Sequence, residues 1–290
     1  MIALQTVHCP VDFSPATPRQ VDLAADLSRA FGAKLVLHHN RHSLGTGASV
    51  GWMWHADHQG QTQATLEEKL AMLAATVSPG VVVETLMTEG PLSRAVVAVA
   101  EAIDADVVVL TEHGNTGDDH VSISEQMLER CSRPVLVMHE PTVETRTPHF
   151  AQAIQDREVV VVPTDLMPGS RAAMQLGFDL ARALPIELHL LHLIPEGLLT
   201  RDQGAAVDEA RTRLEAMVPD DIADRVTLQV GLGDPAEGIL RASDLLRASC
   251  IVMGEHTRTP LRRWFSRDTS RAILHQARCP VWYVPGTHAA

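Results

Sequence analysis

An internal repeat constrains the fold of this sequence more than any other feature. Two blocks of the first half recur in the same order in the second half: 9–40 recurs as 162–193, and 89–114 recurs as 232–257. Within the first block, Asp12 matches Asp165 at the same spacing at which His39 matches His192. The first half also carries extra residues, for which the Gly-rich stretch 43–61 accounts. A chain that contains one structural unit twice is expected to form two similar domains.

Each half alternates short apolar runs with segments of helical periodicity. The runs, rich in Val, Ile and Leu, lie near 4–11, 33–39, 81–87, 106–111 and 134–138, and again near 158–163, 186–192, 226–231, 248–253 and 280–284. Their weak polar alternation is typical of strands buried on both faces. The segments with helical spacing include 17–31, 62–77, 92–103 and 122–132. Such alternation predicts an α/β fold of two doubly wound domains, each a five-stranded parallel sheet with helices on both faces.

The boundary between the two domains is expected in a segment without apolar periodicity. Residues 141–157 fit that description, and the stretch EPTVETRTPHF that covers most of them contains two prolines. We therefore place the first domain at 1–140 and the second at 158–290.

The last apolar run of each half, PVLVM or PVWYV, is expected to lie at the edge of its sheet. Unpaired strand edges favour pairing with another strand. We expect the two halves to pair through these strands as a pseudo-dimer within one chain. A homodimer of the whole chain is a further possible assembly.

Composition narrows the class of protein. The chain has 290 residues, of which 45% are hydrophobic and 21% charged, as in soluble globular proteins. Its formal net charge of −12 disfavours nucleic acid as a partner. It lacks a run of about 18 apolar residues, so a membrane is not an expected partner either.

The start of the chain and its cysteines indicate a cytoplasmic protein. The segment MIALQTVHCPVDF has no basic region and no small-residue cleavage site, and we expect a first strand there rather than a signal peptide. The four cysteines show no CxxC spacing. They are expected to be buried thiols in a reducing compartment.

Three loops in each half follow the carboxyl ends of expected strands. They contain Asp12, Gly90-Pro91 and Thr111-Glu112-His113-Gly114 in the first half, and Asp165, Gly233-Asp234-Pro235 and Gly254-Glu255-His256-Thr257 in the second. Open parallel sheets bind ligands outside these strand ends, so one crevice is expected in each half. The two aspartates have two open interpretations: they form the turn that leads into a helix, or they accept a hydrogen bond from a base or ribose.

The ordered blocks of each half resemble a universal stress protein domain. In the first half these are CPVDFSPATPRQVDLAADLSRAFGAKLVLHH, EGPLSRAVVAVAEAIDADVVVLTEHG and RPVLVM; in the second they are DPAEGILRASDLLRASCIVMGEHT and ARCPVWYV. The resemblance covers nearly the whole chain outside 43–61 and the linker, and it implies the strand order 3-2-1-4-5 in each half. It implies either a non-enzymatic stress-response protein that acts through protein partners, or a member of the family's ATP-binding branch.

The ATP-binding branch has a signature similar to G-x2-G-x9-G-[S/T], whose glycines let backbone N–H groups approach phosphates. The matching positions of the first half are Thr111, Gly114, Val121 and Ser122. Only six residues separate Gly114 from Val121, instead of nine, and Asp118 and Asp119 among them would repel a triphosphate. The resemblance therefore implies a degenerate motif in this half.

The second half keeps the spacing of the signature but not its residues. The matching positions are Gly254, Thr257, Arg267 and Asp268. A side chain at Arg267 would obstruct the close backbone approach that glycine permits. Arginines at Arg258 and Arg267 offer forked hydrogen bonds to an anion instead, although a solvated helix face would have the same pattern.

Two interpretations of function remain open. In the first, both motifs are degenerate and the chain binds no nucleotide. In the second, ATP or another adenine nucleotide binds the second half first, as in a sensor or slow ATPase. Asp165 would then contact the base, and Leu193 would form an apolar wall where the first half has Asn40.

Neither catalysis nor a metal site is expected. The sequence has no GxSxG, GxxxxGK[ST] or HExxH motif, so no catalytic residue is assigned. The histidines at 38, 39, 42, 55 and 58 are candidates to converge on a metal, but no cysteine joins them. His113 and His256 are expected to make structural hydrogen bonds rather than to take part in catalysis.

Overall fold

A computed structural model of the chain describes residues 4–41, 62–112, 123–139, 158–195, 197, 202–254 and 267–286. The first half contains strands β1 (Thr6–Pro10), β2 (Lys34–Arg41), β3 (Val83–Glu89), β4 (Val107–Glu112) and β5 (Val135–His139), with helices α1 (Thr17–Phe31), α2 (Gln63–Thr76), α3 (Leu92–Ala102) and α4 (Ile123–Arg130). These elements lie where the apolar periodicity predicts them.

The second half repeats the same order of elements. It contains β6 (Val159–Pro163), β7 (Glu187–Ile194), β8 (Val226–Leu232), β9 (Cys250–Gly254) and β10 (Val281–Val284), with α5 (Arg171–Ala183), α6 (Gln203–Glu215), α7 (Pro235–Leu245) and α8 (Arg267–Gln276). Two short 3-10 turns, η2 (Pro168–Ser170) and η4 (Asp220–Arg225), precede α5 and β8. The predicted linker lies outside the described residues.

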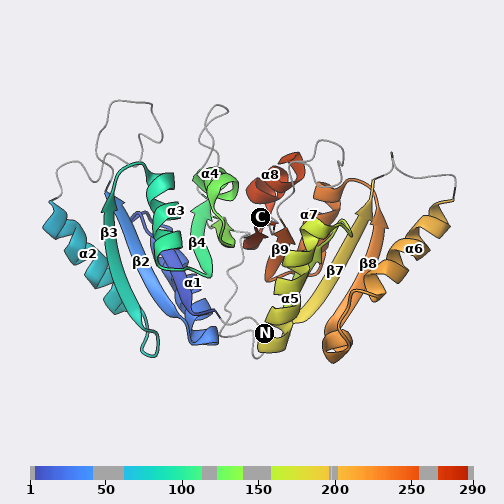
Figure 1. Ribbon diagram of the computed structural model, residues 1–290, viewed down its shortest axis with the longest axis horizontal. Coiled ribbons are helices and arrows are strands. Elements are labelled where there is room, and N and C mark those ends of the chain that lie inside the picture. Colours follow the sequence, from blue (N-terminus) through green and yellow to red (C-terminus); the bar gives the residue numbers. More distant parts are fainter. Residues whose placement is uncertain are drawn as a thin grey trace.

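The strands of the described residues form one ten-stranded sheet, in the order β3-β2-β1-β4-β5-β10-β9-β6-β7-β8. Within each half the pairings are parallel and the order is 3-2-1-4-5, which confirms the predicted fold class. Figure 1 shows the two halves side by side, with β3 and β8 toward the two outer ends.

The halves join through an antiparallel pair of strands at the centre of the sheet. β10 runs against β5, with Trp282 opposite Leu136 and Tyr283 opposite Val135. The two last strands therefore cover each other's edges, as expected for a pseudo-dimer within one chain. Because the pairing is continuous, the two predicted five-stranded sheets form one larger sheet.

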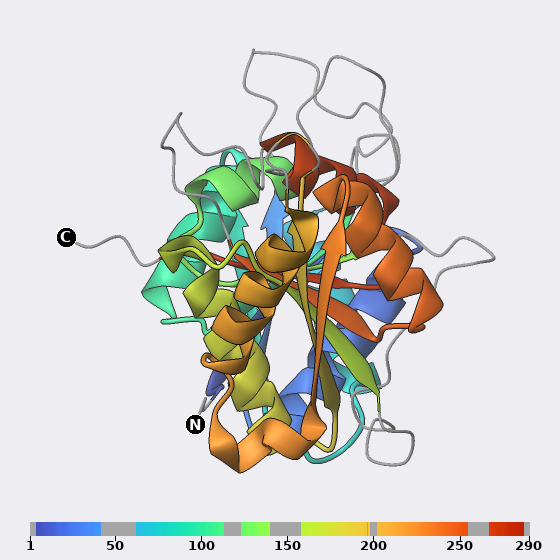
Figure 2. The same cartoon turned by 90° about the vertical axis from the view of Figure 1, so that its right-hand side faces the viewer.

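Helices cover both faces of the sheet (Figures 1 and 2). On one face, α1, α2 and α5 contribute Leu27, Leu70 and Leu180 to a core that also contains Leu136 and Trp282. On the other face, α3, α4, α7 and α8 contribute Val96, Met127, Ile239 and Ile273. Each core contains residues of both halves, so the halves share apolar packing as well as backbone pairing.

The outer strands β3 and β8 differ from the sequence-based expectation of strands buried on both faces. Their exposed residues are Glu84, Thr85 and Glu89 in β3, and Thr227, Gln229 and Leu232 in β8. Each of these strands has a neighbouring strand on one side only. The expectation is therefore wrong for these two strands, because apolar content alone does not distinguish an edge strand from a central one.

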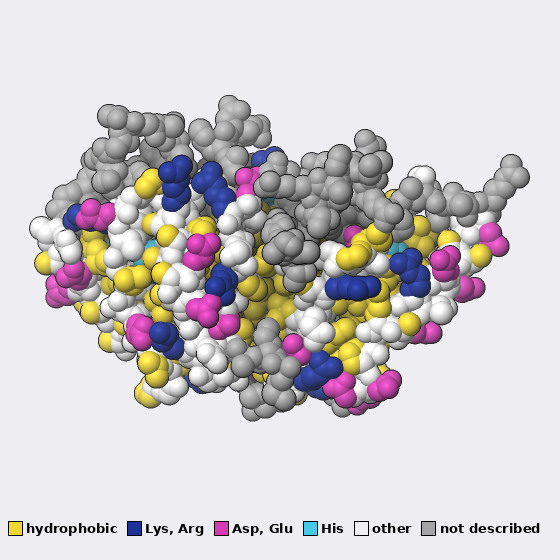
Figure 3. All heavy atoms as spheres, in the orientation of Figure 1, with side chains coloured by type: hydrophobic (Ala, Val, Ile, Leu, Met, Phe, Trp, Pro, Cys, Tyr) yellow, Lys and Arg dark blue, Asp and Glu magenta, His cyan; other side chains and the backbone are white. Residues whose placement is uncertain are grey.

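The surface carries charges of both signs. Figure 3 shows basic and acidic side chains interspersed over one face of the molecule. A nucleic-acid-binding surface instead gathers basic residues on one face or along one helix. Among the helices described, none is both long and apolar enough to cross a membrane.

Candidate functional site

In both halves, the aspartate after the first strand forms the turn that leads into the next helix. Oδ1 of Asp12 accepts hydrogen bonds from the backbone N–H of Ser14 (2.8 Å) and the hydroxyl of Thr17 (2.7 Å). Oδ1 of Asp165 accepts one from the backbone N–H of Met167 (2.9 Å). Bonds from an aspartate to the residue two positions on define an Asx turn. The turn role is thus present in both crevices, and the ligand role stays a prediction.

The residue after each aspartate adopts a backbone conformation that non-glycine residues rarely use. Phe13 has a φ of 61° and Leu166 a φ of 60°. Such residues persist only where the surrounding structure holds them, and they gather at functional sites. The same conformation in both halves indicates that the duplicated loop keeps one shape despite different sequences.

A duplicated histidine within the second strand of each half ties that strand to the loop after the first strand. Nδ1 of His39 lies 2.9 Å from the carbonyl oxygen of Val11, and Nδ1 of His192 lies 2.8 Å from that of Thr164. Burial lowers the pKa of His192 below its usual value, although the hydrogen bond opposes this shift. His39 and His192 therefore have a structural role, which explains why both halves contain them.

The end of the fourth strand differs between the halves. In the second half, a Cβ added to Gly254 would lie 2.7 Å from the carbonyl oxygen of Gly169 and 3.2 Å from Cα of Ser170. The turn before α5 therefore packs directly on the backbone of this glycine. In the first half, Thr111 occupies the same place, and its hydroxyl is buried without a hydrogen-bond partner. Gly254 is thus required for packing within the fold, whatever its relation to a phosphate.

The backbone conformation after the third strand of each half requires a glycine. Gly90 has a φ of 116° and Gly233 a φ of 127°. Residues with a side chain rarely adopt these angles, and glycine adopts them at no steric cost. Both predicted site glycines therefore have a turn role in the structure.

A series of hydrogen-bonded polar side chains, buried at His8 and His38 and partly buried beyond them, runs through the first half to Gly90. Nε2 of His8 lies 3.0 Å from Nδ1 of His38, and Nε2 of His38 lies 2.6 Å from the hydroxyl of Thr88. The Thr88 hydroxyl donates to Oδ1 of Asn40 (2.9 Å), whose amide donates to the carbonyl oxygen of Gly90 (3.0 Å). These contacts cross three strands of the sheet.

The hydrogen bonds between these side chains are all donated in the same direction, from His8 toward Gly90. Because the Thr88 hydroxyl donates to Asn40, it must accept from Nε2–H of His38. Burial lowers the pKa of His38 to about 4 and that of His8 to about 3, so both rings are neutral at pH 7. Nδ1 of His38 then accepts from His8, whose own Nδ1 is buried without a partner.

The second half replaces this polar chain with apolar residues. The strand registers place Val161, Leu191, Gly231 and Leu193 at the positions of His8, His38, Thr88 and Asn40. Leu193 is half-buried, and a Cβ added to Gly231 or Gly238 would lie within 3 Å of its side chain. Its side chain thus packs between β8 and α7, and its predicted contact with a base stays untested.

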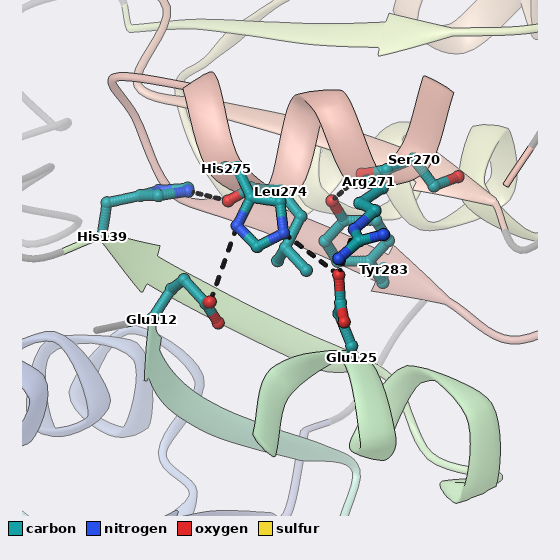
Figure 4. Close-up of polar contacts among 8 residues, drawn as sticks. All are labelled: Glu112, Glu125, His139, Ser270, Arg271, Leu274, His275 and Tyr283. Carbon is teal, nitrogen blue, oxygen red and sulfur yellow. Dashed lines mark hydrogen bonds and ion pairs between the residues drawn. The ribbon is translucent and has the colours of Figure 1, made fainter. Parts of the chain in front are cut away.

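A second polar cluster lies between the two halves (Figure 4). Glu125 of α4 contacts Nε of Arg271 at 2.7 Å and Nε2 of His275 at 3.0 Å, both from α8. Nδ1 of His275 lies 3.7 Å from the buried carboxylate of Glu112, at the end of β4. Nε2–H of His139 donates to the backbone carbonyl of Leu274. This cluster therefore connects β4, α4 and β5 of the first half to α8 of the second.

Two side chains of this region, His139 and Tyr283, have shifted pKa values. Burial lowers the pKa of His139, although its hydrogen bond to Leu274 opposes the shift. Burial and the nearby carboxylate of Glu112 raise the pKa of Tyr283 well above its usual value. The Tyr283 hydroxyl donates to the carbonyl oxygen of Ser270 at 3.1 Å, so it serves as a fixed donor inside the second half.

Several sequence-predicted residues fall outside what the structure describes. Gly114, Ser122 and Arg258 lie outside the described residues, as do His113 and His256. Arg267 begins α8, and only its backbone is described. The predicted contact of Arg258 and Arg267 with an anion therefore remains a prediction. Within the ranges that are described, no group of His, Cys, Asp and Glu side chains has the geometry of a metal site.

Comparison with known proteins identifies the repeated unit. A model of the universal stress protein family matches residues 4–139 and 157–285. Universal stress proteins of Mycobacterium tuberculosis and Mycobacterium bovis are each 28% identical over 171 residues, which is 55% of this chain and 54% of each relative. The chain thus spans about half the length of the curated relatives it matches.

Solved structures share the fold of both halves. A universal stress protein from Archaeoglobus fulgidus superposes with a TM-score of 0.70 at 16% identity, covering 98% of this chain and 97% of its own. A functionally unknown protein from Pseudomonas aeruginosa gives a TM-score of 0.64 at 15% identity, covering 98% and 93%. The chain belongs to the universal stress protein family and carries two domains of that family in tandem.

Proposed function

We propose that this chain is a non-enzymatic stress-response protein that acts through protein partners, with both nucleotide-binding motifs degenerate. The contact between Gly254 and Gly169 carries this proposal. A phosphate cradle needs backbone N–H groups that an anion can approach. At Gly254 the carbonyl oxygen of Gly169 fills the space on the Cβ side of the backbone, so an anion has no room to approach from that side.

The first half supports the same conclusion by a different route. Thr111 places a side chain at the position of the first motif glycine, and this side chain is half-buried. Oδ1 of Asp12 is already engaged by Ser14 and Thr17. A base that used this oxygen would have to compete with two existing hydrogen bonds, one of which keeps the turn closed.

A cytoplasmic location is part of the proposal. All four cysteines are buried thiols. Burial raises the pKa of the Cys9 and Cys250 thiols, which keeps them protonated and poorly reactive. Thiols of this kind are typical of proteins in a reducing compartment.

Titration calorimetry of the full chain with ATP and with AMP tests the proposal, together with mass spectrometry of small molecules released by heat. We expect no micromolar binding and no co-purified adenine nucleotide. Micromolar ATP binding would contradict the proposal and favour the nucleotide-binding alternative. In that case R267A should abolish binding if the second half holds the ligand, and leave it unchanged if the first half does.

A further inference from the structure

We propose that two copies of this chain associate through the exposed edge of β8, with the two β8 strands antiparallel. This inference is independent of nucleotide binding. β8 is an outer strand of the sheet, and among the described residues it is hydrogen-bonded to β7 alone, so no described strand pairs with the N–H and C=O groups of its other edge. The other outer strand, β3, has the same length and place in its half.

Charged residues protect the edge at β3. Glu84 forms an ion pair with Lys34 of β2 at 3.1 Å, and Glu89 forms one with Arg41. Both carboxylates lie on the outermost strand and are exposed. Charges on an edge strand are a common protection against strand pairing, because they would be desolvated or would repel their own copies.

The second half lacks this protection at the same two positions. The strand registers place Thr227 where β3 has Glu84, and Leu232 where it has Glu89. Ile194 occupies the position in the second half that is equivalent to Arg41, and it pairs in register with Leu232. Throughout its seven residues, VTLQVGL, β8 has no charge and no proline. Leu232 is 42% exposed, so an apolar side chain accompanies the open backbone.

A second copy of the chain is the occupant that fits this edge. An interface between two identical strands is closed by a two-fold axis, which requires them to run antiparallel. The β5–β10 junction shows that this fold tolerates such a continuation of the sheet. An uncharged strand meets no repulsion from its own copy. With β3 protected and β8 open, association stops at two chains instead of growing into a fibre.

The test is analytical ultracentrifugation of the full chain over about 1 to 100 µM, the range in which interfaces of moderate affinity dissociate. We expect a dimer in the wild type. T227E/L232E introduces the β3 carboxylates into β8 and should raise the dissociation constant by on the order of tenfold or more. A monomeric wild type would overturn the proposal, as would a double variant that still forms the dimer.

The reciprocal variant E84T/E89L is the matched control. It removes the protection from β3, so we expect the β8 dimer to persist and larger species to appear. If E84T/E89L instead abolishes the dimer, the interface is at β3 and the proposal is wrong. Circular dichroism shows whether each variant keeps its secondary structure.

Hydrogen exchange on the wild type does not depend on any variant folding. The amides of 226–232 should exchange more slowly as the protein concentration rises, while those of 83–89 stay unchanged. Exchange at 226–232 that is independent of concentration, in the range where ultracentrifugation detects dimer, would place the interface elsewhere and overturn the proposal.

Discussion

Gly254 has no space for a side chain, because a Cβ there would lie 2.7 Å from a backbone oxygen of the turn before α5. G254A should therefore force this turn to move. We expect a loss of about 1–3 kcal/mol in the free energy of unfolding, the usual cost of overpacking. Urea denaturation measures it.

G204A is the matched control for this substitution. Gly204 lies in the first turn of α6, and a Cβ there would contact only the side chain of Asp202, at 3.5 Å. Replacing a helical glycine with alanine is expected to be neutral or to stabilise by up to about 1 kcal/mol. Equal losses in G254A and G204A would show that the contact with Gly169 is unimportant.

His8 and His38 predict a dependence of stability on pH. Their pKa values in the folded state are about 3 and about 4, against 6.5 for the ordinary group. As pH falls below about 6.5 the unfolded chain takes up protons that the folded chain refuses, so stability falls. We expect each histidine to contribute a loss of about 3 kcal/mol between pH 7 and pH 4, which is about 6 kcal/mol for the pair.

Urea unfolding at both pH values checks this expectation. H8V/H38L carries the residues that the second half has at the same positions, Val161 and Leu191, and should lose most of this pH dependence. H189L removes another strand histidine, whose Nε2 bonds Gln229 at 2.7 Å, and should retain it. An unchanged pH profile in H8V/H38L would exclude the histidine pair as the cause.

The sequence predicted the positions of these residues better than their contacts. The repeat placed Asp12, Asp165 and Gly254 at the ends of strands, where the structure has them. It did not reveal that Gly254 packs on Gly169, because the contact depends on the path of a neighbouring turn. The sequence also did not reveal the hydrogen-bonded series of side chains from His8 to Asn40. Its one signal was that His8, His38 and Asn40 are polar where the matching positions of the repeat are apolar.

Helices α4 and α8 face each other across the junction of the halves, and Glu125 connects them (Figure 4). E125Q should weaken its contacts with Arg271 and His275. Since Arg271 is largely exposed, we expect a coupling energy between Glu125 and Arg271 below about 1 kcal/mol. A double-mutant cycle with E125Q and R271A measures it. A coupling near zero would indicate that apolar packing alone joins these helices.

The ion pair between Lys34 and Glu84 provides a control for that cycle. It is also partly exposed, but both residues lie within the first half. A cycle with K34A and E84Q should give a similar coupling energy in the full chain. K34A and E84Q should leave the cooperativity of unfolding between the halves unchanged, because neither residue lies at the junction.

The continuous sheet predicts that the halves unfold together. Trp282 is fully buried at the junction and pairs in register with Leu136 of the first half. W282A should cost about 3–5 kcal/mol. Calorimetry should then show one transition in the wild type and two separated transitions in W282A.

W282F serves as a milder variant. The indole N–H of Trp282 is buried without a hydrogen-bond partner, so phenylalanine loses no such bond there. We expect W282F to lose less free energy of unfolding than W282A and to show a single calorimetric transition. Two transitions already in the wild type would show that the shared sheet does not couple the halves.

Most of the architecture of the molecule was accessible from the sequence. Apolar runs and the repeat predicted the strands of each half, and the resemblance to a known domain predicted their order and the pairing of the two last strands. The difference between the edges β3 and β8 was not evident, because both read as apolar runs. It depends on which cross-strand neighbours face each other, such as Lys34 and Glu84, and such pairs follow only from the register.

The β5–β10 junction lies within one polypeptide, and this has a genetic consequence. In a homodimer of identical chains every mutation appears twice, once in each crevice. Here His8 and Val161 occupy equivalent places but are encoded by separate codons. One half can therefore acquire a new chemistry while the other keeps the old one. A tandem chain can thus evolve a division of labour that a symmetric dimer cannot.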